Sequence, residues 1–146
     1  FGGLAEGLVS RKKVEPNEID IQISEEITVV SDRTALDIIA KNLLDNAVKY
    51  TDSPRKIRVI AVADEKNRVV IEVIDNGIGI DRRYLKRVFH RFYRAEDATV
   101  RQRKGTGLGL FVVSALVRQL GGRAVALSDG VGRGTTIRIT LPRLPS

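Results

Sequence analysis

The fold is decided by the stretch Asn42-Leu43-Leu44-Asp45-Asn46-Ala47-Val48-Lys49-Tyr50-Thr51 together with the residues just before it. Apolar residues recur there at i, i+3, i+4 and i+7, namely Leu36, Ile39, Ala40, Leu43 and Ala47. This period predicts a helix with one stripe facing a core. Ser31 or Asp32 can cap its start, and we expect it to end near Tyr50-Thr51, before Pro54.

Segments typical of strands lie on both sides of this helix. The expected strands are 19–23, a second candidate at 27–30, a hairpin of 57–63 and 69–74 around the polar turn 64–68, and closing strands at 124–127 and 135–141. We also expect a short helix near 81–89 and a longer one from about Gly107 to Gly121-Gly122. Because strands and helices mix without regular βαβ alternation, the sequence predicts an α+β sandwich with helices on one face of a sheet.

The composition limits the chain to one domain and excludes several kinds of site. It has 146 residues, 42% of them hydrophobic, and contains no Cys and a single His. Disulfides, Cys-based zinc sites and His-rich metal sites are therefore excluded. No apolar run approaches the roughly 20 residues that span a bilayer. The chain begins Phe1-Gly2-Gly3 without an initiator Met, so we expect a fragment of a larger protein.

The positive charge is confined to one segment. Residues 82–104 hold nine Lys/Arg and two Asp/Glu, a balance equal to the chain's net +7, so the rest of the chain is neutral overall. Two glycine motifs, 75–80 and 105–110, bracket this segment. The placement predicts a bound polyanion such as a nucleotide phosphate chain, although a basic face is also the footprint of nucleic-acid binding.

Polar side chains beside the apolar stripe suggest a ligand site. Asn42, Asn46 and Lys49 fall within about 60° on the predicted helix, at roughly 100° per residue. An amide oxygen suits Mg²⁺ and an amine suits a phosphate. An ordinary polar flank with an Asp45 to Lys49 ion pair is the alternative.

The two glycine motifs allow both a structural and a functional interpretation. Asp75 precedes Asn76-Gly77, which forms a common turn, yet a carboxylate at a strand end can also accept a hydrogen bond from an amine such as adenine N6. Residues 105–110 open a helix, whose free N–H groups can hold phosphates or simply cap the helix. Neither a P-loop nor a dinucleotide motif fits them. The aromatic residues of 88–94 can form a satellite core, or support basic residues that fold over a triphosphate.

In order and spacing, these elements resemble the sensor histidine kinases. Residues 42–51 look like the N box, 75–80 the G1 box, 89–94 the F box, 105–110 the G2 box and 132–135 the last glycine motif. The resemblance implies the Bergerat fold, with a mixed five-stranded sheet and about three helices on one face. It implies ATP and Mg²⁺ as cofactors, with Asn46 at the metal and Asn42 and Lys49 as further catalytic residues. The implied nucleotide-binding residues are Asn42, Asn46, Lys49, Tyr50, Asp75, Gly77, Gly79, Ile80, Phe89, Tyr93, Arg94, Arg103, Lys104, Gly105, Thr106, Gly107, Leu108, Gly109, Leu110 and Thr135.

The resemblance also implies phosphoryl transfer to a histidine. Hydrolytic relatives place a Glu four residues before the metal Asn, where this chain has Asn42, and an amide cannot act as a general base. The acceptor is expected on a separate dimerisation domain, because His90 sits in a variable position of the F box and is followed by Arg91-Phe92-Tyr93 rather than by a phosphoacceptor motif. We expect 1–18 to be an arm from that domain, 19–146 to be the catalytic domain, and about 90–106 to be the ATP lid.

The expected partners are the dimerisation domain of the same parent and, through it, a response regulator. We expect no nucleic acid and no direct membrane contact, a monomeric fragment, and a cytoplasmic domain of a membrane-anchored parent. The alternatives are an anti-sigma-type serine protein kinase of the same fold, a basic nucleic-acid-binding module, and a degenerate domain that binds ATP only for regulation.

Overall fold

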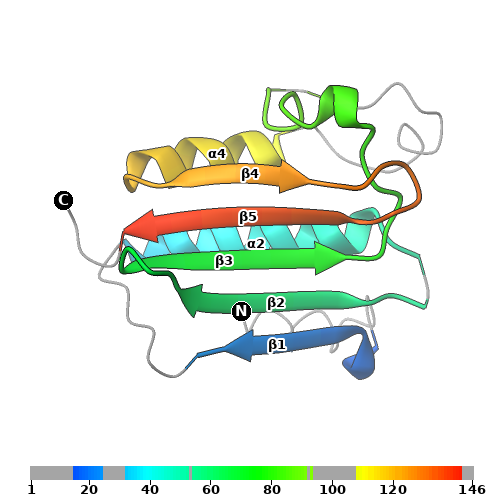
Figure 1. Cartoon of the computed structure of the whole chain (residues 1–146), viewed down its shortest axis with the longest axis horizontal. Helices are drawn as coiled ribbons and strands as arrows, with labels where there is room; N and C mark the ends of the chain where they lie inside the picture. The colour runs from blue at the N-terminus through cyan, green and yellow to red at the C-terminus, as the bar shows by residue number, and fades with distance from the viewer. Residues whose placement is uncertain (1–14, 25–31, 53, 92, 94–107, 143–146) are drawn as a thin grey trace.

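The computed structural model describes residues 15–24, 32–52, 54–91, 93 and 108–142. These residues form one sheet with two α-helices on one of its faces (Figure 1). The strands are β1 (Ile19–Ile23), β2 (Ile57–Ala63), β3 (Arg68–Asp75), β4 (Arg123–Leu127) and β5 (Thr135–Pro142). The helices are α2 (Arg33–Lys49) and α4 (Gly109–Gln119), with the 3-10 helices η1 (Pro16–Glu18) and η2 (Arg82–Tyr84).

The sheet is mixed, as the family resemblance implies. Its order is β1-β2-β3-β5-β4, with β1 parallel to β2 and the other pairs antiparallel. The hairpin of β2 and β3 is confirmed. β5 lies between β3 and β4, and its register sets Thr135 opposite Asp75. The end of β3 is therefore joined to the start of a strand that follows 60 positions later.

The predicted stripe of α2 forms the centre of the core. Asp32 caps the helix by accepting a hydrogen bond from the Ala35 N–H at 3.1 Å. Leu43 and Leu44 are fully buried, with 1% and 0% of their surface exposed. They pack with side chains from every layer: Ile57, Val59, Val73, Ala126, Ile137, Ile139 and Leu141 of the sheet, and Val113 and Val117 of α4. One core thus joins the two helices to the sheet.

The predicted short helix at 81–89 is shorter than expected. Only Arg82–Tyr84 is helical, as a 3-10 turn, and residues 85–91 continue in turns with bonds from Arg87 N to Tyr84 O and from His90 N to Arg87 O, both 2.9 Å. An α-helix would set like charges at i and i+4, Arg82 above Lys86 and Arg83 above Arg87, where they repel. All four side chains are exposed, as predicted.

The described residues thus contain two α-helices rather than about three. The second begins at Gly109, and a left-handed Gly121, with φ of 83°, follows its end as predicted. The possible strand at 27–30 lies outside the described residues. Within the described part of the chain, no helix is long and apolar enough to cross a membrane.

Candidate functional site

The predicted site residues that the structure describes gather around one end of the two helices and of β3. The Ile78 N–H donates to the Tyr50 carbonyl at 3.1 Å, so the glycine turn after β3 sits against the end of α2. A Cβ added to Gly109 would lie 3.4 Å from Asn42 Oδ1, so the start of α4 adjoins the same helix. Segments that are far apart in the sequence, around Asn42, Ile78 and Gly109, are thereby brought close together.

The polar track of α2 is half-buried, as its position beside the stripe predicts. Asn42 donates from Nδ2 to the Ile38 carbonyl at 2.8 Å, and its Oδ1 faces Gly109. Lys49 Nζ lies 4.8 Å from the centre of the Tyr50 ring, a cation-π contact. Asn46 is half-buried and its side chain has no hydrogen bond to another described residue. An unbonded, half-buried amide oxygen fits a hard cation such as Mg²⁺, which accepts neutral oxygen ligands.

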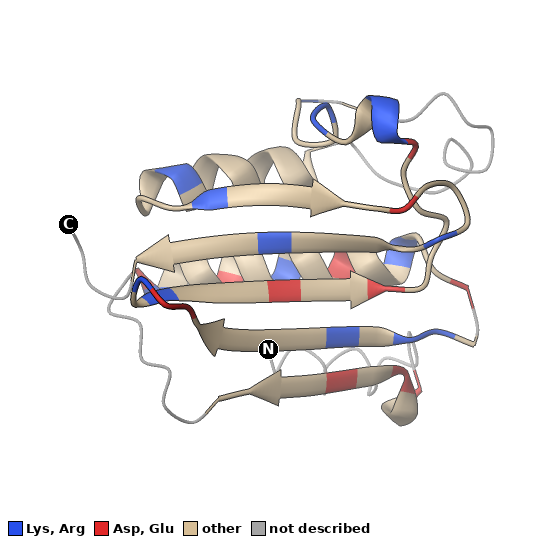
Figure 2. Ribbon diagram, viewed as in Figure 1, with Lys and Arg blue, Asp and Glu red and all other residues tan. Residues whose placement is uncertain are grey.

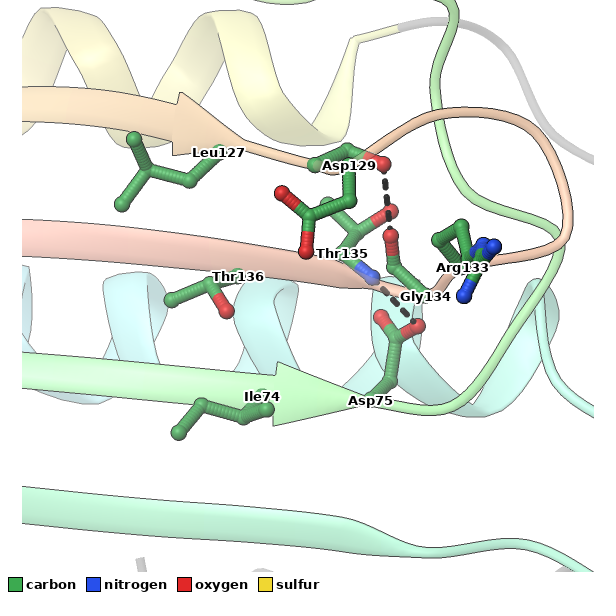
Figure 3. Close-up of a pocket in the computed structure, with 9 residues that line it drawn as sticks. Ile74, Asp75, Leu127, Asp129, Arg133, Gly134, Thr135 and Thr136 are labelled. Atoms are coloured by element: carbon green, nitrogen blue, oxygen red, sulfur yellow. Dashed lines mark hydrogen bonds between the residues drawn. The ribbon is translucent and has the colours of Figure 1, made fainter.

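Asp75 ends β3 as a buried carboxylate, with 8% of its surface exposed. Its Oδ1 accepts from Gly77 N at 2.8 Å. The same oxygen accepts from Thr135 N at 3.2 Å (Figure 3). Burial raises the pKa of this carboxyl to about 6, although the two N–H groups act in the opposite direction. Within the described part of the chain, Oδ2 accepts no hydrogen bond. Asp75 therefore offers one oxygen, already oriented, to a donor from outside.

A pocket adjoins this carboxylate at the ends of β3 and β4 and the start of β5 (Figure 3). Its lining residues are Ile74, Asp75, Leu127, Ser128, Asp129, Arg133, Gly134, Thr135 and Thr136. Asp75 thus borders open space as well as the protein interior.

Gly77 and Gly79 are required by the protein's own backbone. A Cβ on Gly77 would collide with the Tyr50 carbonyl oxygen, and one on Gly79 with the Gly130 carbonyl oxygen. Gly79 also has φ of 72°, in the left-handed region. Any substitution at either position would push the turn away from its neighbours.

The loop 128–134 holds the glycine turn through hydrogen bonds that sequence reasoning missed. Gly132 N donates to Ile78 O at 2.7 Å and Gly134 N to Gly77 O at 3.2 Å. Ser128 Oγ accepts from Ile80 N at 3.1 Å and donates to Gly134 O at 2.7 Å. The signal in the sequence was a Ser before Asp129-Gly130 at a strand end, which is typical of a side chain that bonds nearby backbone.

Ser128→Ala is therefore expected to destabilise the fold by about 1 to 3 kcal/mol, because it leaves a partly buried N–H and carbonyl without their shared partner. Urea unfolding would measure the loss. Ser114→Ala is the matched control, since Ser114 lies on α4 where Ala favours the helix. Equal midpoints for the two variants would contradict the role of Ser128.

Two aromatic residues of the basic segment join the main core rather than a separate satellite core. Phe89 and Tyr93 lie against the main core, as do Ile80 and Leu110, and Val88 belongs to it. Their contact with a nucleotide stays a prediction. The predicted contacts at Arg94, Arg103, Lys104, Gly105, Thr106 and Gly107 lie outside the described residues. Leu108 precedes α4 and its carbonyl accepts the Val112 N–H at 2.9 Å.

Comparisons with known proteins identify the family of the chain. Residues 31–145 match the family described as histidine kinase-, DNA gyrase B- and HSP90-like ATPases. The sensor protein SrrB of Staphylococcus aureus is 35% identical over 112 residues, which cover 77% of this chain and 19% of SrrB. The chain thus spans about a fifth of the length of the curated relatives it matches.

Solved structures share the fold over nearly the whole chain. The mycobacterial sensor histidine kinase MprB has a TM-score of 0.78 and 26% identity, covering 99% of this chain and 97% of that one. Full-length ShkA, solved in complex with AMPPNP, has a TM-score of 0.76 and 27% identity, covering 99% of this chain and 30% of that one.

Proposed function

We propose a function from the premise that the chain belongs to the family of histidine kinase-, DNA gyrase B- and HSP90-like ATPases. In this proposal the chain binds Mg²⁺-ATP and donates the γ-phosphoryl group to a histidine. That histidine lies on a separate dimerisation domain of the parent protein, in two-component signalling. The chain is homologous to sensor histidine kinases, which supports this branch of the family.

The observation that carries the proposal is the oriented carboxylate of Asp75. It is buried, its Oδ1 is held by two backbone N–H groups, and Oδ2 remains for a donor. An exocyclic amine such as adenine N6 is such a donor, whereas guanine presents a carbonyl at the equivalent position. Asp75 would therefore select adenine.

The phosphate end of the nucleotide would lie along α2 and the start of α4. Asn46 would hold Mg²⁺, whose charge would neutralise that of the phosphates when it is bound. Lys49 would contact a phosphate oxygen, and Asn42 would lie beside both. The start of α4 adds the positive end of a helix dipole. Catalysis would come from positioning, because the acceptor supplies its own nucleophile.

In the proposed step an imidazole nitrogen forms a bond to the γ-phosphorus while the bond to the bridging β-γ oxygen breaks, and ADP leaves. Asn42 stands where a hydrolytic relative would carry Glu, and its amide cannot take a proton from water. Water is therefore a poor acceptor. The proposed partners are the dimerisation domain and, through it, a response regulator, with this domain in the cytoplasm.

The chain alone should not phosphorylate itself, whereas mixing it with Mg²⁺-ATP and the separately expressed dimerisation domain should give phosphohistidine on that domain. Radiolabel that is labile in acid and stable in base would identify the product. His90→Gln is the control, because His90 is exposed and should be dispensable. Label on His90, or a phosphoserine product, would contradict the proposal, and the latter would favour a serine kinase.

A further inference from the structure

The turn that carries Asp75 is held by the loop between α2 and β2, and one side chain of that loop links it to the N-terminal side of the domain. We propose that Arg55 is a positioning residue for adenine recognition. It fixes the position of the 75–77 turn relative to Glu18, which lies just before β1. This inference rests on the proposed function, because it concerns the geometry of the same site.

The side chain of Arg55 reaches the turn through Thr51. Arg55 Nε donates to Thr51 Oγ1 at 3.0 Å, and that hydroxyl donates to Ala47 O at 2.8 Å. Thr51 is 1% exposed. A Cβ on Gly77 would lie 2.9 Å from the Thr51 methyl group, so Gly77 packs directly on Thr51. Since Gly77 N orients Asp75 Oδ1, the guanidinium is three contacts from the carboxylate.

The backbone on either side of Arg55 holds the middle of the same turn. Lys56 N donates to Asn76 Oδ1 at 2.9 Å, and Asn76 Nδ2 donates to Pro54 O at 3.1 Å. Asn76 stands between Asp75 and Gly77. A shift of the 54–56 backbone would therefore move Asn76, and a shift of the Arg55 side chain would move Thr51, so both routes end at the 75–77 turn.

Glu18 fixes Arg55 from the other side. It is 7% exposed, and its carboxylate accepts from Arg55 N at 2.9 Å and from Glu15 N at 2.6 Å. The Arg55 guanidinium lies 3.9 Å from it. The Glu15 and Arg55 N–H groups lower the pKa of Glu18, which keeps the carboxylate ionised at neutral pH. Arg55 thus bridges η1, which leads into β1, and the end of α2.

Arg55→Met is expected to lower ATP affinity by about three- to tenfold, within the roughly 2- to 30-fold effects of residues that act on a site without touching its ligand. GTP affinity should change less, so the ATP:GTP preference should fall. Arg58→Met is the matched control: the same substitution three positions along, at an exposed side chain of β2 that lies 3.5 Å from Gln22 Oε1. It should bind both nucleotides as the unmodified chain does.

Calorimetric titration of the 146-residue chain with ATP and GTP in Mg²⁺ would measure both affinities, and urea unfolding would report stability. If Arg55→Met does not fold, Arg55→Lys takes its place in the experiment. It keeps a charge beside Glu18 but lacks the Nε donor, so it should shift the ATP:GTP preference in the same direction. Thr51→Val combined with Arg55→Met should show less than the sum of the two separate losses in ATP affinity.

A lower urea midpoint with unchanged ATP affinity and unchanged ATP:GTP preference would overturn the inference, because a merely structural residue behaves in that way. So would equal effects of Arg55→Met and Arg58→Met on nucleotide selectivity. The proposed function fails separately, if the unmodified chain shows no preference for ATP over GTP.

Discussion

Asn46→Ala is expected to weaken Mg²⁺-dependent ATP binding by about a hundredfold, the upper end of the loss seen when a group that supports a metal is removed. The side chain is half-buried and has no hydrogen bond to another described residue, so its truncation breaks no hydrogen bond within the described part of the fold. Ala also favours a helix more than Asn does. The free energy of unfolding should therefore stay the same or rise slightly.

Calorimetry with ATP in Mg²⁺ and again in excess chelator would measure this effect. The two affinities should differ strongly in the unmodified chain and hardly at all in the variant. Asp45→Ala is the control, because Asp45 is the neighbouring residue on the same helix and is exposed. Unchanged affinity of Asn46→Ala in Mg²⁺ would refute the metal role.

Asp75→Asn is expected to weaken ATP binding and stabilise the fold at the same time. The Asn Oδ1 can still accept from Gly77 N and Thr135 N, so the two backbone bonds survive. Its amide group, however, would present a donor to adenine N6 in place of Oδ2. A lost hydrogen bond to a charged acceptor costs about 1 to 3 kcal/mol, which corresponds to roughly 5- to 150-fold in affinity.

The gain in stability follows from the pKa of Asp75. Burial raises it from 3.8 to about 6 in the folded chain, so the folded state binds this proton more tightly than the unfolded state does. The resulting stabilisation is complete below about pH 4 and is lost as pH rises through 6. At pH 8 the folded chain holds a buried charge that the Asn variant lacks.

Urea unfolding of both chains between pH 4 and pH 8 would therefore show the Asn variant more stable at pH 8, with the difference shrinking toward pH 4. Glu18, Asp64 and Asp81 have lowered pKa values, so they lose stabilising contacts in acid. They are common to both chains and cancel in the difference. If the Asp75→Asn variant bound ATP normally and kept its preference for ATP over GTP, the role of Asp75 in recognising adenine would be contradicted.

Local patterns predicted much of the fold. The apolar stripe of α2, the hairpin of β2 and β3 and the closing strands appear where period and turn residues placed them, because each depends on neighbours along the chain. The short helix predicted near 81–89 is reduced to a 3-10 turn at Arg82–Tyr84, because the prediction gave too little weight to like charges one turn apart.

Part of the candidate site could also be predicted, and part could not. Asn42, Asn46 and Asp75 stood out because their residue types suggest chemistry at a helix flank and a strand end. Their supports did not: Ser128 bonds Ile80 across 48 positions, and Thr135 bonds Asp75 across 60. Arg55 likewise resembles any exposed arginine until Glu18, 37 positions earlier, is seen beside it. Such pairs follow from the packing of distant segments rather than from a periodic pattern.

The place of β5 in the sheet has a consequence for the order of assembly during synthesis. β5 follows the other four strands in sequence, yet it lies between β3 and β4 (Figure 1). A growing chain that has not yet reached residue 135 leaves the edge of β3 without its partner, and unpaired strand edges of this kind favour aggregation. Insertion of β5 covers that edge and places the Thr135 N–H on Asp75 in the same event.

The charged residues are also distributed between separate parts of the molecule. The segment 82–91 lies at the end of the molecule where α4 begins, away from β1 (Figure 2). Glu72 and Arg138 form an ion pair across β3 and β5. That pair can form only when the late strand arrives in register. A nascent domain would therefore acquire this cross-strand ion pair and its oriented carboxylate together. Competence to bind a nucleotide would then report completed synthesis of the sheet.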